Sequence, residues 1–120
     1  MNEIKKTYKN YVGGKYVRSE SGKTFRIELK NDFYEVPLTS RKDIRDAVVA
    51  AKKGFIDWQK LTPYNKTQVL YRLSEMLEGN FETYQQILQD AGLTKAKASD
   101  DIHKALDSLI WYAGMADKWE

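Results

Sequence analysis

Cysteine is absent from this chain of 120 residues, and histidine occurs once, as His103. Without cysteine the chain forms no disulfide, gives no thiolate to a metal ion and holds no cysteine nucleophile. One histidine cannot supply a His/Cys metal cluster. Asp100, Asp101 and Asp107 lie nearby in the sequence and make a weak His-carboxylate site conceivable. Aspartates at the front of a helix are better explained by capping and the helix dipole, so we predict no metal-binding residue.

Long apolar runs are also missing. No run approaches the length that spans a bilayer, and residues 1–6 have no hydrophobic core for a signal peptide. The chain is 42% hydrophobic and 31% charged, which is typical of a soluble globular protein. We therefore expect a cytoplasmic protein with no membrane partner and, at this length, one domain at most.

Several motifs that carry chemistry are missing too. Neither of the common glycine-rich phosphate loops occurs, and there is no Gly-x-Ser-x-Gly nucleophile elbow. Gly13-Gly14-Lys15 has the composition of a phosphate cradle, but it lies between β-forming residues with no helix after it, which favours a hairpin turn. The carboxylates are scattered on polar helix faces, so they form no glycosidase-type pair. We predict no catalytic residue and no cofactor-binding residue in this chain.

The charge is modest and uneven. The chain has 20 basic and 17 acidic residues, a net charge of +3, while residues 1–30 alone carry eight bases and three glutamates. A basic arm can bind nucleic acid, which is a weaker reading here because the bases form no dense run. They are better explained as the solvated face of strands, and we predict no nucleic-acid partner. The bases are Lys5, Lys6, Lys9, Lys15, Arg18, Lys23, Arg26 and Lys30.

Residues 8–36 are predicted to form strands and turns. The Gly13-Gly14 pair suits a tight hairpin because primed turns need positive φ. Residues 24–29 alternate polar and apolar side chains, as a half-buried strand does. Further signals are turns at residues 19–22 and at Asn31-Asp32, and a short strand over residues 33–36 that ends at Pro37.

From Ser40 onward the apolar residues recur at helical spacing. Four helix starts are predicted: Ser40 with Asp43 as a capping pair, Thr62 before Pro63, Asn80 as a cap, and a start between Lys95 and Ser99. Gly79 and Gly92 are the predicted stops. The expected apolar stripes are Ile44, Ala47, Val48, Ala51, Phe55 and Trp58; Val69, Leu70, Leu73, Met76 and Leu77; Phe81, Tyr84, Ile87 and Leu88; and Ile102, Ala105, Leu106, Leu109, Ile110 and Ala113.

The predicted fold class is therefore α+β and mainly helical. A β-hairpin arm (residues 8–36) precedes about four amphipathic helices (residues 40–120), in a single incomplete domain over residues 1–120. Helices this short cover one another only partly in a small domain. Trp58, Trp111, Tyr112, Met115 and Trp119 are more apolar surface than such a domain can bury. We expect this surface to face a partner, either the rest of a larger protein or another subunit, and we expect a homo-oligomer.

Four segments, in this order along the chain, resemble the N-terminal part of aldehyde dehydrogenases. They are the Tyr-Val-Gly-Gly-Lys-Tyr-Val-Arg-Ser hairpin at Tyr11–Ser19, the alanine-rich helix Ser40–Trp58, the helix Leu61–Glu78, and the Tyr-Ala-Gly-Met-Ala-Asp-Lys-Trp ending at Tyr112–Trp119. Met115 stands where the family usually has Trp. Residues 24–37 and the Asp90–Leu93 region also depart from the family pattern, as in a divergent branch.

The resemblance implies NAD(P)-dependent oxidation of an aldehyde to a carboxylic acid through a cysteine thiohemiacetal, with a glutamate base for hydrolysis. It places those groups beyond Glu120, so the chain alone is expected to be inactive. It also makes residues near Ile102 to Trp111 possible neighbours of the substrate tunnel. Since the chain ends in an aromatic-rich helix without a capping Gly or Pro, we expect it to be interrupted there. The alternative is a small interaction module that binds itself or a full-length dehydrogenase.

Overall fold

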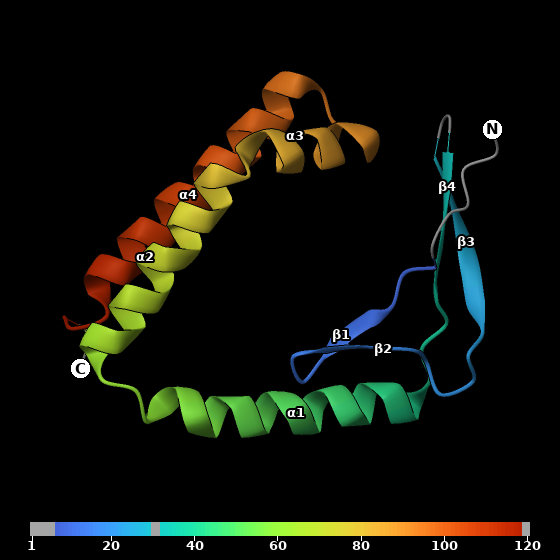
Figure 1. The fold of residues 1–120 in the computed structure, drawn as a ribbon, viewed down its shortest axis with the longest axis horizontal. Coiled ribbons are helices and arrows are strands. Elements are labelled where there is room, and N and C mark those ends of the chain that lie inside the picture. The colour runs from blue at the N-terminus through green and yellow to red at the C-terminus, as the bar shows by residue number, and fades with distance from the viewer. Residues whose placement is uncertain (1–6, 30–31, 119–120) are drawn as a thin grey trace. The chain divides into compact units, whose positions relative to one another are not determined.

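The computed structural model describes residues 7–29 and 32–118. The predictions made for Lys5, Lys6, Lys30, Asn31 and Trp119 therefore lie outside the described residues. The chain divides into two compact units, residues 1–60 and residues 61–120 (Figure 1). No helix within the described ranges has the length and hydropathy needed to cross a membrane.

The first unit contains two antiparallel hairpins and one long helix. Strands β1 (Asn10–Val12) and β2 (Lys15–Val17) form one hairpin, and β3 (Thr24–Leu29) and β4 (Asp32–Pro37) form the other. The β3–β4 register pairs Thr24 with Pro37 and Leu29 with Asp32. Helix α1 (Arg41–Gln59) follows, and β1 lies against it. The predicted strands and turns over residues 10–29 and the predicted strand over residues 33–36 are confirmed, whereas Asp32, predicted to lie in a turn, is the first residue of β4.

Local chemistry explains the turn and the helix start in this unit. Gly13 and Gly14 have φ of +62° and +79°, the left-handed region that the two-residue hairpin turn requires. Ser40 Oγ accepts from the Asp43 N–H, and the Asp43 carboxylate accepts from the Ser40 N–H at 2.8 Å. This reciprocal pair confirms the predicted capping box. The Glu20 N–H also donates to Asp43 Oδ1 at 2.9 Å, so the cap fastens the residue 19–22 turn to α1.

The second unit is a helical hairpin with a short third helix. Helix α2 (Pro63–Gly79) packs along α4 (Lys95–Met115), and α3 (Phe81–Asp90) packs on α4 as well. The buried apolar side chains in the described part of the chain all belong to α4: Ala98, Ile102, Leu106 and Ala113. Ser74 is buried on α2, where its hydroxyl donates to the Leu70 carbonyl. Thr67 Oγ1 donates to the Ala113 carbonyl at 2.8 Å and so joins α2 to α4.

Two helix caps in this unit are as predicted and one differs. Thr62 caps α2 with Pro63 in the first turn, and α3 ends before Gly92, whose φ is +108°. Asn80 occupies the N-cap position of α3 as predicted, but its side chain makes no bond to the α3 N-terminus and donates to the Met76 carbonyl at 2.8 Å. The amide satisfies a free carbonyl at the end of α2, which competes with the N-cap role. Thr94, not singled out from the sequence, caps α4 by accepting from the Lys97 N–H.

The predicted fold class, α+β and mainly helical, is confirmed by this architecture. The prediction of one incomplete domain over residues 1–120 stays a prediction. The main division in contacts falls after Lys60, within the predicted helical part, instead of between the strand arm and the helices.

Candidate functional site

The surroundings of His103 are those of an ordinary helix surface. Its ring lies 5.1 Å from the Phe81 ring, centroid to centroid, at an interplanar angle of 42°. Asp100 pairs with Lys104 at 3.0 Å and Asp101 pairs with Lys97 at 3.2 Å, each four residues apart along α4. These carboxylates face lysines and do not converge with His103 on one point. Within residues 7–29 and 32–118, no group of three His, Cys, Asp or Glu side chains is placed to hold a metal ion.

The pKa shifts near His103 have the same local origin. The hydrogen bond and positive charge of Lys104 lower the pKa of the Asp100 carboxyl, and Asp100 in turn raises the pKa of Lys104. Both side chains are exposed, so the shifts report a solvated surface pair and not the tuned acid or base of an active site.

Gly13 and Gly14 are confirmed as a hairpin turn. They connect β1 to β2, and the next helix along the chain begins only at Arg41. A phosphate cradle of the dinucleotide-binding kind requires a helix N-terminus directly after the glycine turn. The described residues therefore do not fit such a cradle at this position.

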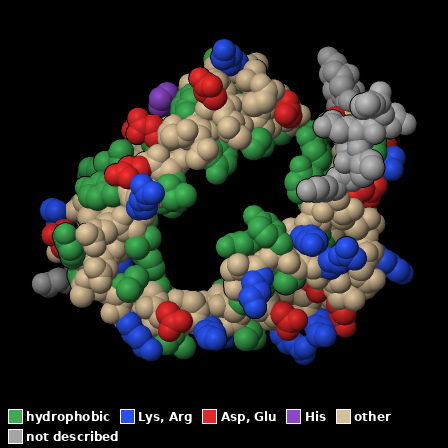
Figure 2. Space-filling view, viewed as in Figure 1, with side chains coloured by type: hydrophobic (Ala, Val, Ile, Leu, Met, Phe, Trp, Pro, Cys, Tyr) green, Lys and Arg blue, Asp and Glu red, His purple; other side chains and the backbone are tan. Residues whose placement is uncertain are grey.

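The most extensive feature of both units is exposed apolar surface (Figure 2). On α1, Ile44 and Phe55 are 59% and 63% exposed, and Val48 between them is also exposed. We call these three residues the α1 apolar face. In the second unit the exposed large apolar side chains include Val69, Leu73 and Met76 on α2 and Ile110, Trp111 and Tyr112 on α4. We call these six residues the α2–α4 apolar face.

Sequence periodicity placed most of these side chains on the apolar stripes of their helices. Ile102, Leu106 and Ala113 are buried as the α4 stripe predicted, whereas Ile110 in the same stripe is 50% exposed. The apolar stripe of α4 is wider than the surface that α2 and α3 cover. Of the apolar side chains predicted to stay unburied, Trp58, Trp111 and Tyr112 are exposed, and Met115 is half-buried. The tunnel role suggested for Ile102 to Trp111 stays a prediction.

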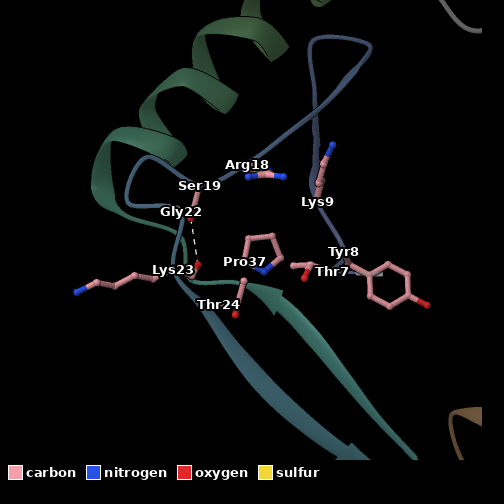
Figure 3. A pocket seen from close by; sticks show the side chains of 9 residues that line it. All are labelled: Thr7, Tyr8, Lys9, Arg18, Ser19, Gly22, Lys23, Thr24 and Pro37. Carbon is pink, nitrogen blue, oxygen red and sulfur yellow. Dashed lines mark hydrogen bonds between the residues drawn. The ribbon is translucent and has the colours of Figure 1, made fainter. Parts of the chain in front are cut away.

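A polar pocket of about 630 Å³ lies in the first unit (Figure 3). It is lined by Thr7, Tyr8, Lys9, Arg18, Ser19, Gly22, Lys23, Thr24 and Pro37. Sequence reasoning treated the three bases in this set as a solvated strand face. It missed their grouping because the residue 19–22 turn brings residue 18 and residues 22–24 beside residues 7–9.

A second pocket of about 260 Å³ in the same unit has a different lining. Glu20, Asp43 and Asp46 contribute to it, together with Lys42 and Arg18. The Asp43 carboxylate is already held by the backbone N–H groups of Ser40 and Glu20, and the Ser40 bond is the main cause of its lowered pKa. This pocket therefore belongs to the cap that fastens the turn to α1.

The comparisons with known proteins agree on one family. Residues 17–120 match the family model for the aldehyde dehydrogenase family. Malonate-semialdehyde dehydrogenase 2 of Geobacillus kaustophilus (strain HTA426) is 28% identical over 112 residues, which are 90% of this chain and 23% of that protein. An aldehyde dehydrogenase of Aspergillus niger is 33% identical over 115 residues, again 90% of this chain and 23% of the relative.

Solved structures give the same result. The NAD-dependent aldehyde dehydrogenase of Sinorhizobium meliloti matches 98% of this chain with a TM-score of 0.86 and 26% identity, over 25% of its own length. The aldehyde dehydrogenase KauB of Pseudomonas aeruginosa matches 98% of this chain with a TM-score of 0.87 and 26% identity, again over 25% of its own length. The chain thus spans about a quarter of the length of these proteins.

Proposed function

This chain belongs to the aldehyde dehydrogenase family, and we propose that it serves as the N-terminal segment of an NAD(P)-dependent enzyme that oxidises an aldehyde to a carboxylic acid. The match over residues 17–120, with coverage of only about a quarter of each relative, carries the proposal. In this role the chain supplies scaffold, and the reacting groups belong to the other three quarters of the enzyme.

The residues of this chain are consistent with a scaffold role. It has no cysteine, so it holds no candidate for the thiol nucleophile that the family resemblance implies. A strand follows Gly13 and Gly14, so this turn does not fit a dinucleotide-binding cradle. In the complete enzyme, NAD or NADP would accept the hydride. We assign no cofactor-binding residue to this chain.

The two apolar faces support the proposal that a partner covers them. The α1 apolar face and the α2–α4 apolar face together expose nine large apolar side chains. Exposed apolar side chains in this number are typical of interaction surfaces. We propose that the remainder of the dehydrogenase covers these faces and that the assembled protein forms a homo-oligomer.

Enzyme assays test the inactivity of the isolated chain. We expect no aldehyde-dependent NAD⁺ or NADP⁺ reduction by the purified 120-residue chain with a panel of aldehydes, including malonate semialdehyde. The Geobacillus relative serves as the positive control. Turnover by the pure chain above the buffer background would contradict the proposal, because it would require a nucleophile other than cysteine.

A second candidate function is favoured by the same exposed side chains. The chain would be a small module that binds itself, or a full-length dehydrogenase subunit, through the α2–α4 apolar face. Light scattering coupled to size-exclusion chromatography tests self-association. A concentration-independent monomer that also fails to bind a purified full-length dehydrogenase would rule this second candidate out.

A further inference from the structure

The 630 Å³ pocket of the first unit has a backbone frame fixed by hydrogen bonds. The Tyr8 N–H donates to the Glu35 carbonyl at 3.0 Å, which fastens the first segment to β4. The Lys23 carbonyl accepts from the Leu38 N–H at 2.9 Å and from Ser19 Oγ at 3.2 Å. These bonds tie together the three chain segments that line the pocket, so its walls are held by the fold and not by side chains alone.

The charge around this pocket has one sign. Lys9, Arg18 and Lys23 contribute to the lining, and among the described residues no Asp or Glu does. Neither Lys9 nor Arg18 is in an ion pair with a carboxylate of the described ranges. Glu35 accepts from Thr24 Oγ1 at 3.0 Å, but Arg26 at 3.1 Å already balances its charge. An excess of positive charge beside hydroxyl groups favours an anion.

Lys9 and Arg18 are the two bases that we assign to a ligand. Both line the pocket, whereas in Figure 3 the Lys23 side chain extends away from the other labelled side chains. The planar guanidinium of arginine matches two oxygens of a phosphate group, and lysine adds a point charge. The volume of about 630 Å³ is within the range of small-molecule sites, and Pro37 offers an apolar wall beside the polar groups.

We propose that this pocket binds the phosphate group of a small phosphorylated molecule, held by Lys9 and Arg18. The hydroxyls of Thr7 and Thr24 line the same space. The neighbouring 260 Å³ pocket is lined by Glu20, Asp43 and Asp46 and by the bases Arg18 and Lys42, so acidic side chains outnumber basic ones there and an anion is less favoured. Arg18 thus lines both the more acidic 260 Å³ pocket and the basic 630 Å³ pocket, and the phosphate binds in the basic one. The site does not depend on aldehyde oxidation.

Inorganic pyrophosphate is the probe for the test, titrated into the ¹⁵N-labelled 120-residue chain at low ionic strength. The expected result is saturable shifts of amide signals in residues 7–9 and 18–24, with little change in the second unit. The double variant Lys9→Gln/Arg18→Gln is expected to weaken binding at least about tenfold, because two charge-assisted contacts are lost. The matched control Lys52→Gln/Lys53→Gln removes the same charge from exposed positions on α1 and should stay within about twofold, since screened charges away from the site contribute little.

The outcomes separate a built site from diffuse attraction. Equal weakening by both double variants, or shifts spread over the lysines of α1, would overturn the proposal in favour of non-specific charge. Absence of saturable shifts at millimolar pyrophosphate would overturn it outright. Citrate binding as tightly as pyrophosphate would overturn the phosphate assignment. If the Lys9→Gln/Arg18→Gln variant does not fold, the location of the shifts in the unaltered chain still decides the question.

Discussion

Ile102 and Ile110 give a matched pair of substitutions that tests which face of α4 is covered. Both are isoleucines of the same helix, and their side chains are 4% and 50% exposed. Ile102→Ala removes buried methylene groups and leaves a cavity, which costs about 2–5 kcal/mol in protein interiors. Ile110→Ala loses only part of that burial, about 1 kcal/mol, and the better helix propensity of alanine offsets about 0.4 kcal/mol of the loss.

Urea unfolding followed by far-UV circular dichroism measures both variants in the isolated chain. We expect the Ile102→Ala chain to lose at least about 2 kcal/mol of unfolding free energy. The Ile110→Ala chain should stay within about 1 kcal/mol of the unaltered chain.

The same pair behaves differently if a partner covers the α2–α4 apolar face. In a full-length dehydrogenase that contains this segment, Ile110→Ala is expected to become as costly as Ile102→Ala, because the covered side chain would then leave a cavity as well. Equal, small effects of Ile110→Ala in the isolated chain and in the full-length protein would refute the reasoning that this face is a buried interface.

Three smaller changes test the local structure. Ser40→Ala removes the α1 cap and should cost about 1 kcal/mol, whereas Ser108→Ala on the exposed side of α4 should cost nothing; equal effects in urea unfolding would contradict the cap. The hydrogen bond from the Ser40 N–H lowers the pKa of the Asp43 carboxyl below its usual 3.8. The Asp43 carboxylate therefore stabilises the fold above pH 3.8, and this stabilisation is lost as the pH falls through the lower pKa of the folded state. Asp43→Asn should flatten acid unfolding curves in that pH window. Thr67→Val breaks the hydrogen bond to the Ala113 carbonyl and should cost about 1 kcal/mol, while Thr67→Ser keeps the hydroxyl and should retain more stability; the reverse order would argue against the bond.

Local signals in the sequence were enough to place most elements. Ser40 with Asp43, Thr62 before Pro63, and the Gly13-Gly14 pair each specify a cap or a turn through bonds within a few residues. Such interactions are set by the chain itself and need no knowledge of tertiary packing. Asn80 is the N-cap residue of α3, but its amide can bond to the helix before it or to the helix after it, and the sequence does not rank the two.

Tertiary features were harder to predict. The apolar stripe of α4 identified Ile102 and Leu106 correctly, but periodicity gives a face and not the number of helices that cover it. The same limit explains the exposure of Ile110. The pocket at Lys9 and Arg18 depends on which strands and turns lie side by side, so a scan of charge along the chain could not group these residues.

The size of the native gene product tests the central claim most directly, namely that this chain serves as the N-terminal segment of an aldehyde dehydrogenase. An antibody raised against residues 40–118 would be used to probe extracts of the source cells. We predict a band several times heavier than the 14.0 kDa of this chain, because the matched relatives are about four times its length. A single band at 14.0 kDa would contradict the claim and favour a small interaction module.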